Sequence, residues 1–169
     1  MGSVLMVIGS RRFRDEEYFE PRGVFEAAGL SVVTASSREG PVRGALGGWA
    51  TAERFLAGVR AADHGAIVFC GGDGAREFLS SRVAWRLCRH AIEQRKVLGA
   101  ICLAPLILAN AGVLKDRRVT AWPEVREDLE RAGAIVVADP VVVDERLVTA
   151  DGPRHASAFA EAIVRLLRG

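Results

Sequence analysis

The sequence contains few cysteines, few lysines and no long apolar run. Its three cysteines, Cys70, Cys88 and Cys102, are odd in number and match no disulfide or metal-site spacing, so we expect free thiols. The first apolar run, 4–8, is too short for a signal peptide, and no run is long enough to cross a bilayer. These absences predict a cytoplasmic protein with no metal and no membrane partner.

The charged residues give no indication of a nucleic-acid partner. Lys96 and Lys115 are the only lysines, and the arginines are interspersed with acids, which leaves a net charge of +2. Such a dispersed pattern is typical of solvated faces. The 169 residues, 50% of them hydrophobic, suffice for one domain with a substantial core, and no change in composition marks a second. We therefore expect a single domain over 1–169.

Apolar runs alternate with amphipathic segments along the chain. The predicted strands are 3–9, 30–35, 66–69, 97–101 and 134–138, with a hairpin over 141–149. The predicted helices are 16–28, 51–61 (with Thr51 as N-cap), 75–94, 106–111, 123–132 and 153–167. Segment 36–48 is rich in glycine and too irregular for a helix, and we expect a hairpin around 42–46. The alternation predicts an α/β fold, a doubly wound and mostly parallel sheet with helices on both faces.

Cys102 lies where the strand 97–101 is expected to turn sharply into a helix. A thiol at such an elbow stands at the carboxyl edge of the sheet, where ligands bind in open α/β folds. The N–H groups and dipole of the next helix would favour thiolate. The alternative is that Cys102 is a small apolar residue packed at a strand end, and its position alone leaves both interpretations open.

Two other segments reach the same sheet edge. Gly71, Gly72 and Asp73 follow a buried strand and open a helix, so their N–H groups could bind an oxyanion, although a tight strand-to-helix turn is the better explanation of this segment taken alone. The acidic cluster of Asp15, Glu16, Glu17 and Glu20 begins the first helix and would ordinarily complement its dipole. Within that cluster, Glu17 is the leading candidate for a hydrogen-bond partner and proton shuttle to Cys102.

No histidine stands beside Cys102, because the next residue is Leu103. His155 could approach the thiol only if the loop 151–153 folds over the site. Trp122 could form a pocket wall, although a core or interface position is the commoner one for tryptophan.

Taken together, these segments resemble the ThiJ/PfpI superfamily, which includes the Parkinson-disease-associated protein deglycase, intracellular peptidase-like proteins and glutathione-independent glyoxalases. The resemblance rests on 4–8, Glu17 with Pro21 and Gly29, the run 66–72, the run 100–105 and the run 111–114, in that order. It implies a flavodoxin-like or glutamine amidotransferase-like fold with a nucleophile elbow. It also implies no cofactor and a homodimer or larger assembly, for which Trp49 or Trp85 could provide a contact.

The resemblance also assigns roles to residues. Cys102 falls on the reactive cysteine, Glu17 on the glutamate that hydrogen-bonds it, and Gly72, Asp73 and Leu103 on the backbone that lines the oxyanion site. Two positions depart from the superfamily, because Leu103 and Trp122 stand where other members have histidine. The loss of these two bases disfavours proteolysis.

Three functions remain open. The first is a cofactor-independent cysteine enzyme that acts on a small aldehyde or a glycated substrate, with Cys102 as the nucleophile and Glu17 as the proton carrier. The second is a non-enzymatic redox sensor or stress protein whose Cys102 is oxidised. The third is a peptidase or amide hydrolase.

Overall fold

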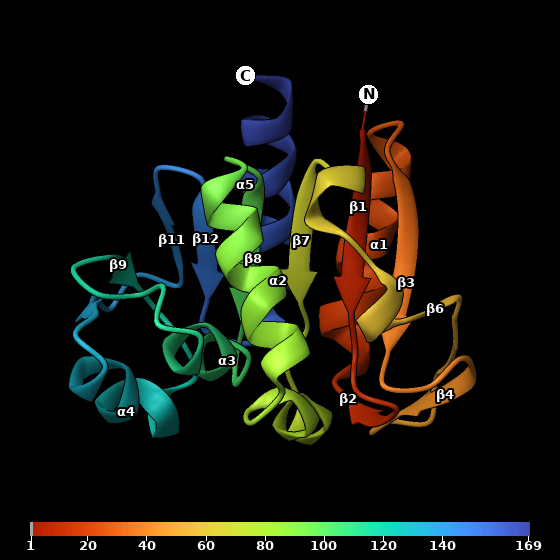
Figure 1. Ribbon diagram of the computed structural model, residues 1–169, viewed down its shortest axis with the longest axis horizontal. Coiled ribbons are helices and arrows are strands. Elements are labelled where there is room, and N and C mark those ends of the chain that lie inside the picture. Colours follow the sequence, from red (N-terminus) through yellow and green to blue (C-terminus); the bar gives the residue numbers. More distant parts are fainter. Residues whose placement is uncertain (1) are drawn as a thin grey trace.

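Seven strands form the central sheet of the computed structural model, which describes residues 2–169 (Figure 1). In spatial order they are β11 (Val141–Asp144), β12 (Leu147–Ala150), β8 (Val97–Ile101), β7 (Ala66–Phe69), β1 (Ser3–Val7), β3 (Ser31–Ser36) and β6 (Arg54–Phe55). Every neighbouring pair is parallel except β11 and β12, which form an antiparallel hairpin at one edge. The predicted α/β class with a mostly parallel sheet is confirmed.

Helices cover both faces of this sheet (Figure 1). On one face α1 (Asp15–Ala27) packs against α5 (Ala156–Arg168), and Phe25 and Phe159 belong to the apolar cluster beneath them. On the other face lie α2 (Arg82–Glu93) and α3 (Pro105–Asn110), with Leu87 and Ile107 in a second cluster. Because helices cover both faces, β1, β7 and β8 are buried almost throughout, which explains their unbroken apolar sequences.

Two small sheets extend the molecule. One contains β2 (Arg11–Phe13), β4 (Gly40–Gly44) and β5 (Trp49–Ala52), and the other contains β9 (Arg118–Val119) and β10 (Ile135–Val136). The strand predicted over 134–138 therefore shrinks to β10 and lies outside the central sheet. The hairpin predicted around 42–46 is shifted, because its turn covers 45–48 between β4 and β5.

The helix predicted over 51–61 with Thr51 as its cap is wrong. The chain there forms β5, β6 and two short 3₁₀ turns, η1 (Leu56–Gly58) and η2 (Ala61–Asp63). Ala50 and Ala52 are buried while Trp49 and Thr51 point outward, and this period of two fits the pairing with β4. Tertiary pairing therefore overrides the helical composition of the segment.

The helix predicted over 75–94 is interrupted. Residues Asp73–Phe78 form the 3₁₀ helix η3, and α2 begins only at Arg82. Ser81 caps α2, because its hydroxyl oxygen accepts a hydrogen bond from the N–H of Ala84 at 3.1 Å. The two helices predicted over 123–132 and 153–167 also begin as 3₁₀ turns, η4 (Pro123–Val125) and η5 (Pro153–His155), before α4 (Arg126–Arg131) and α5.

The register of the central strands places the loops that follow them at one edge. Val7 of β1 pairs with Phe69 of β7, which pairs in turn with Ala100 of β8. The segments after β7 and β8 therefore leave the sheet side by side, and α1 begins at the same edge after β2. No helix within 2–169 is both long enough and apolar enough to cross a bilayer.

Candidate active site at the Cys102 elbow

Cys102 occupies the turn between β8 and α3. Its φ of +64° lies in the left-handed region, which agrees with the predicted elbow and costs a residue other than glycine on the order of 1 to 3 kcal/mol. Two backbone hydrogen bonds hold this conformation. The N–H of Cys102 donates to the carbonyl of Ala150 at 2.9 Å, and its own carbonyl accepts from the N–H of Trp122 at 3.0 Å. The elbow is therefore fixed between two loops.

The environment of the Cys102 sulfur favours the neutral thiol. Burial and the nearby charge of Glu17 raise the pKa of the thiol to about 12, and the N–H groups of Gly72 and Leu103 near the sulfur partly oppose the rise. The expectation that this site favours thiolate is therefore wrong in direction. The following helix, α3, has only 6 residues, so its dipole is weak, and desolvation dominates.

Glu17 is the buried carboxyl group of the site. Its side chain has no solvent exposure, and Oε1 accepts a hydrogen bond from the N–H of Gly71 at 3.0 Å. The carboxyl also lies against the Cys102 thiol, while Oε2 has no hydrogen-bond partner among the described residues. Burial raises the pKa of Glu17 to about 7, against smaller opposing effects from the thiol, from Gly71 and from the charge of Arg14. The carboxyl can therefore gain or lose a proton near neutral pH.

The other acids of the first helix face away from Cys102. Asp15 accepts hydrogen bonds from the N–H groups of Leu46 and Gly48, both at 2.8 Å. Glu16 forms an ion pair with Arg14 at 2.9 Å, and Glu20 accepts from the hydroxyl of Ser157 at 3.1 Å. Among the four acids of the cluster, only Glu17 reaches the thiol.

The glycine loop is shaped by its contact with the site. A side chain on Gly71 would lie 2.7 Å from Cβ of Cys102 and would also collide with the Glu17 carboxyl. Gly71 is therefore required by close packing, whereas Gly72 contributes its N–H to the sulfur. Asp73 does not contribute its side chain, since its carboxylate pairs at the surface with Arg76 at 2.9 Å and Arg12 at 3.5 Å.

A pocket of about 380 Å³ lies among the loops that hydrogen-bond the elbow, although neither Cys102 nor Glu17 is among its lining residues. It is lined by Arg14, Trp122, Pro123, Asp151, Gly152, Pro153, Arg154 and His155. The loop that contains His155 follows Ala150, the residue whose carbonyl holds Cys102, so the loop does fold toward the site. The ring of Trp122 packs directly on Gly152, where a side chain would approach it to 3.2 Å.

Two residues of this pocket were not found from the sequence. Asp151 and His155 are hydrogen-bonded, because Oδ1 of Asp151 lies 2.8 Å from Nδ1 of the His155 ring. The spacing of four residues between an acid and a histidine could have indicated this pair. Arg14 lies close enough for its charge to lower the pKa of Glu17, and its N–H donates to the carbonyl of Gly71 at 3.1 Å. Nothing in the sequence around Arg14 indicates this position.

Cys70 and Cys88 are both buried in the core, and burial raises their thiol pKa values strongly. Within 2–169, no three His, Cys, Asp or Glu side chains gather in a way that could hold a metal ion.

Comparison with known proteins identifies the family. Residues 2–166 match the DJ-1/PfpI family. The chain belongs to this family. A computed superposition on the crystal structure of a ThiJ/PfpI domain protein from Brachyspira murdochii gives a TM-score of 0.96, with 31% sequence identity over 98% of this chain and 96% of that one.

Relatives in the DJ-1/PfpI family carry several names. An uncharacterised protein of Methanocaldococcus jannaschii is 41% identical over 97% of this chain and 82% of its own length. General stress protein 18 of Bacillus subtilis is 31% identical over 99% of both chains. A deglycase of Pyrococcus abyssi is 27% identical over 97% of this chain and 99% of its own, and a glutathione-independent glyoxalase of Caenorhabditis elegans also matches. The family therefore makes an enzymatic function plausible.

Proposed function

We propose that this protein is a cofactor-independent cysteine enzyme that converts small reactive carbonyl compounds, as a glyoxalase or deglycase does. The observation that carries the proposal is the Glu17 carboxyl, buried against the Cys102 thiol with a pKa of about 7. A carboxyl group with this pKa is present in both protonation states near neutral pH, which suits it to accept and return protons.

The first chemical step is addition of the thiol to the aldehyde. The sulfur forms a bond to the carbonyl carbon while the Glu17 carboxylate takes the thiol proton, because the free thiolate is too costly in this buried site. The carbonyl oxygen becomes an oxyanion, receives hydrogen bonds from the N–H groups of Gly72 and Leu103, and then takes the proton back from Glu17. The product is a hemithioacetal, and every atom of the thiol and the aldehyde is retained in it.

The second step is an internal rearrangement. With a 2-oxoaldehyde substrate, the Glu17 carboxylate removes the proton from the carbon attached to sulfur and returns it to the neighbouring carbon, while the hydroxyl proton of the first carbon passes to the oxygen of the second. Oxidation of the first carbon and reduction of the second balance, so the thioester forms without an external oxidant. Water then attacks the thioester, the carbon–sulfur bond breaks, and a 2-hydroxy acid leaves while the thiol is restored.

The pocket fits a small substrate. Its volume of about 380 Å³ and its wall formed by Trp122 and Pro123 suit a compact carbonyl compound or a glycated amine. The Asp151–His155 pair stands on the same wall and offers a second proton-carrying group at the entrance.

The test is a substrate panel of methylglyoxal, a glycated amino acid and an unmodified peptide. We expect wild-type protein to release lactate from methylglyoxal, Cys102→Ser to lose this activity, and Glu17→Gln to lose about a hundredfold or more. Glu16→Gln is the matched control, since that carboxylate pairs with Arg14 instead of reaching the thiol. Peptide cleavage without aldehyde turnover would refute the proposal in favour of the hydrolase alternative, which Leu103 disfavours.

Redox sensing by Cys102 is a second candidate. The groups that would hold an oxyanion, the N–H groups of Gly72 and Leu103, also surround the sulfur and would stabilise an added oxygen. Hydrogen peroxide would convert the thiol to sulfenic acid with release of water. Mass spectrometry after mild peroxide treatment separates the two candidates: a sensor accumulates the oxidised Cys102 peptide and turns over no aldehyde in its reduced form.

We further propose that the protein acts in the reducing cytoplasm and forms a homodimer or larger assembly. Trp49 and Leu46 are 62% and 65% exposed at the β4–β5 hairpin, which suits a contact with a second copy. Trp85, by contrast, is partly buried and packs against the core. Light scattering on wild-type protein and on Trp49→Ser measures the oligomeric state, and a monomeric wild type would refute this assembly.

A further inference from the structure

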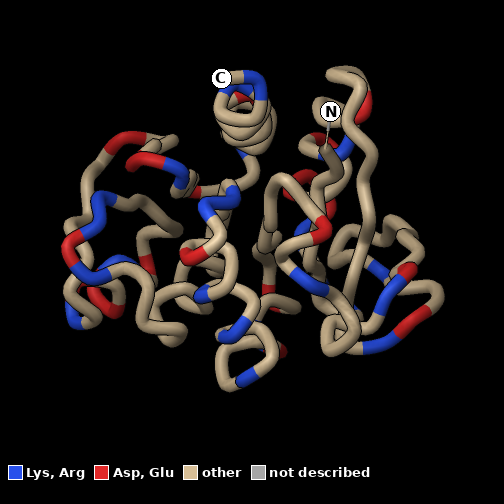
Figure 2. The backbone as a smooth tube through the Cα atoms, turned by 45° about the horizontal axis from the view of Figure 1, so that its top comes forward, with Lys and Arg blue, Asp and Glu red and all other residues tan. Residues whose placement is uncertain are grey.

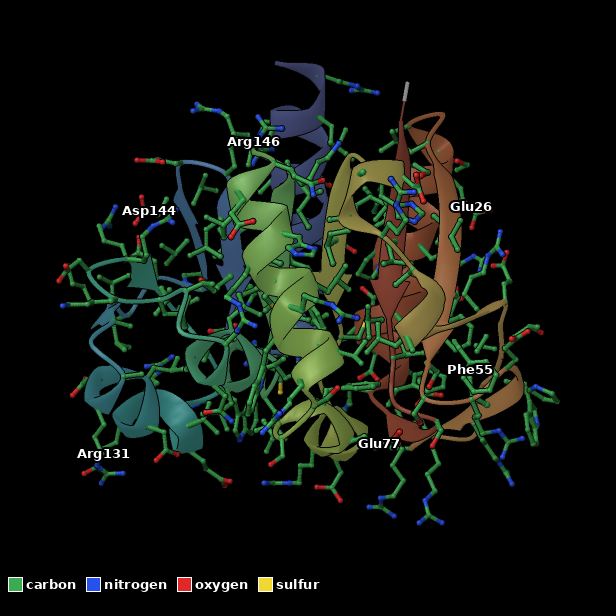
Figure 3. All side chains as sticks on the ribbon, viewed as in Figure 1. Glu26, Phe55, Glu77, Arg131, Asp144 and Arg146 are labelled. Carbon is green, nitrogen blue, oxygen red and sulfur yellow. The ribbon has the colours of Figure 1, made fainter. Side chains whose placement is uncertain are left out.

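A second pocket lies at the opposite end of the central sheet from Cys102. It has a volume of about 230 Å³ and is lined by Ile92, Arg95, Lys96, Arg117, Glu145 and Arg146. These residues come from the end of α2 and the turn that follows it, from the β11–β12 hairpin turn and from the segment before β9. Figure 3 labels Asp144 and Arg146 at this end of the molecule and Glu77 at the other. We call this cavity the basic pocket.

Positive charge in the basic pocket exceeds the negative charge available to it. Arg117 is neutralised by Asp144, whose Oδ2 lies 3.3 Å from its Nε and whose carbonyl accepts from its Nη2 at 2.7 Å. Within 2–169, no carboxylate oxygen lies within 4.0 Å of the cationic groups of the other three basic residues, and Glu145 is the one acid on the lining. Basic and acidic residues are otherwise well mixed along the chain, as Figure 2 shows with this end turned forward.

One guanidinium N–H of the basic pocket has no acceptor. Nε of Arg146 is buried and has no hydrogen-bond partner among the described residues. Buried polar groups in folded proteins are nearly always paired with protein, water or a bound ion. A water molecule or a bound anion at this end of the molecule would supply the missing acceptor.

The backbone around the basic pocket is held in place. Arg95 and Glu145 have φ values of +57° and +54°, a conformation that normally favours glycine. The two turns are joined by a hydrogen bond from the N–H of Leu98 to the carbonyl of Arg146 at 2.9 Å, and the N–H of Lys96 donates to Ala91 at 2.8 Å. The Cα positions of the basic residues are thus fixed relative to one another, so the backbone needs no rearrangement when a ligand binds.

We propose that the basic pocket binds the phosphate group of a small molecule. Guanidinium groups bind phosphate with paired, charge-assisted hydrogen bonds, and ammonium groups add a further positive charge. A concave site whose lining carries an excess of positive charge also concentrates an anionic ligand. The pocket is smaller than those that enclose drug-sized ligands, which fits a single phosphate group better than a polymer. The proposal uses no residue of the Cys102 site and does not depend on the function proposed for it.

Calorimetric titration tests the proposal with two ligands, inorganic phosphate and ribose 5-phosphate, in a buffer kept at constant ionic strength with chloride. We expect wild-type protein to bind at least one of them, and Arg146→Ala to weaken binding by about tenfold or more. Tighter binding of ribose 5-phosphate identifies a phosphate ester as the ligand, and tighter binding of inorganic phosphate identifies the free ion. Either result supports the phosphate site.

Two further variants guard against a folding defect. Arg95→Gly removes a charge and relieves the positive φ, so it should weaken phosphate binding without a loss of thermal stability. Arg131→Ala is the matched control, because Arg131 lies on α4 and pairs with Glu127 and Asp128 at 2.9 Å. Absence of binding to wild-type protein, or equal weakening in Arg131→Ala and Arg95→Gly, would overturn the proposal.

Discussion

The carboxyl of Glu17 lies against the Cys102 thiol inside the protein, and this proximity affects their two protonation equilibria in opposite directions. Burial raises the pKa of both groups, and their contact then lowers the pKa of the carboxyl and raises that of the thiol. The proton of the pair therefore resides mainly on sulfur when Glu17 is ionised. The two groups titrate as a coupled unit.

The first prediction is a pH dependence of aldehyde turnover. The active form has Glu17 as a carboxylate, so kcat/KM should rise with pH and level off above the carboxyl pKa of about 7. Steady-state rates from pH 5 to 9 check this. Glu17→Gln should lose most of the activity and show no increase of kcat/KM with pH. Glu20→Gln should keep the activity and its pH dependence. An unchanged pH dependence of kcat/KM in Glu17→Gln would show that Glu17 takes no part in the mechanism.

The second prediction concerns stability. Because burial raises the pKa of Glu17 from 4.5 to about 7 in the folded state, its contribution is fully present below pH 4.5 and is lost as pH rises through 7. From pH 4.5 to pH 8, the free energy of unfolding of wild-type protein should fall relative to that of Glu17→Gln by on the order of 3 kcal/mol. Urea denaturation of both proteins at the two pH values measures this difference, and parallel curves would contradict it.

The third prediction concerns thiol reactivity. Cys102 should be the first thiol alkylated by iodoacetamide, since Cys70 and Cys88 lie in the core with strongly raised pKa values. Glu17→Gln should accelerate this alkylation at pH 9, because removal of the carboxylate charge lowers the pKa of the thiol. Peptide mapping after limited labelling checks both statements. Slower alkylation in Glu17→Gln would contradict this prediction and would show that the loss of the proton acceptor outweighs the relief of charge repulsion.

The fourth prediction concerns the glycine loop. Gly71→Ala should abolish turnover and destabilise the fold, because the new methyl group would overlap Cβ of Cys102 and the Glu17 carboxyl. Gly58→Ala is the matched control, since nothing lies within 4 Å of a methyl group at that position. The melting temperature and the turnover rate should therefore fall in Gly71→Ala and stay at the wild-type values in Gly58→Ala. Full activity in Gly71→Ala would mean that the loop can move away from the elbow.

The sequence predicts the central sheet well where burial alone determines structure. The apolar runs of β1, β7 and β8 have no exposed face, so they could only be strands covered on both sides. The sequence fails where pairing with a neighbouring strand decides the outcome. Residues 49–52 become β5 because β4 lies beside them, and no local pattern identifies that partner.

The candidate site likewise has features that the sequence predicts and features that depend on the fold. Cys102, Glu17 and the glycine loop were found because they follow recognisable strands or resemble a family motif. The direction in which the pKa of the Cys102 thiol shifts could not be predicted from the sequence. It depends on how far burial outweighs the two nearby N–H groups, and that balance is set by the three-dimensional structure. Arg14 was missed because its approach to the site depends on the fold of β2 and α1.

The two backbone hydrogen bonds of Cys102 link its amide to the loops that line the pocket. Because the N–H of Cys102 is bonded to Ala150 and the N–H of Trp122 is bonded to Cys102, these two amide protons report on the loops that form the pocket wall. A molecule that settles against Trp122 should slow the exchange of both protons with solvent deuterium. Slower exchange of the Cys102 amide proton would thus report binding in the pocket before any covalent bond to the sulfur forms.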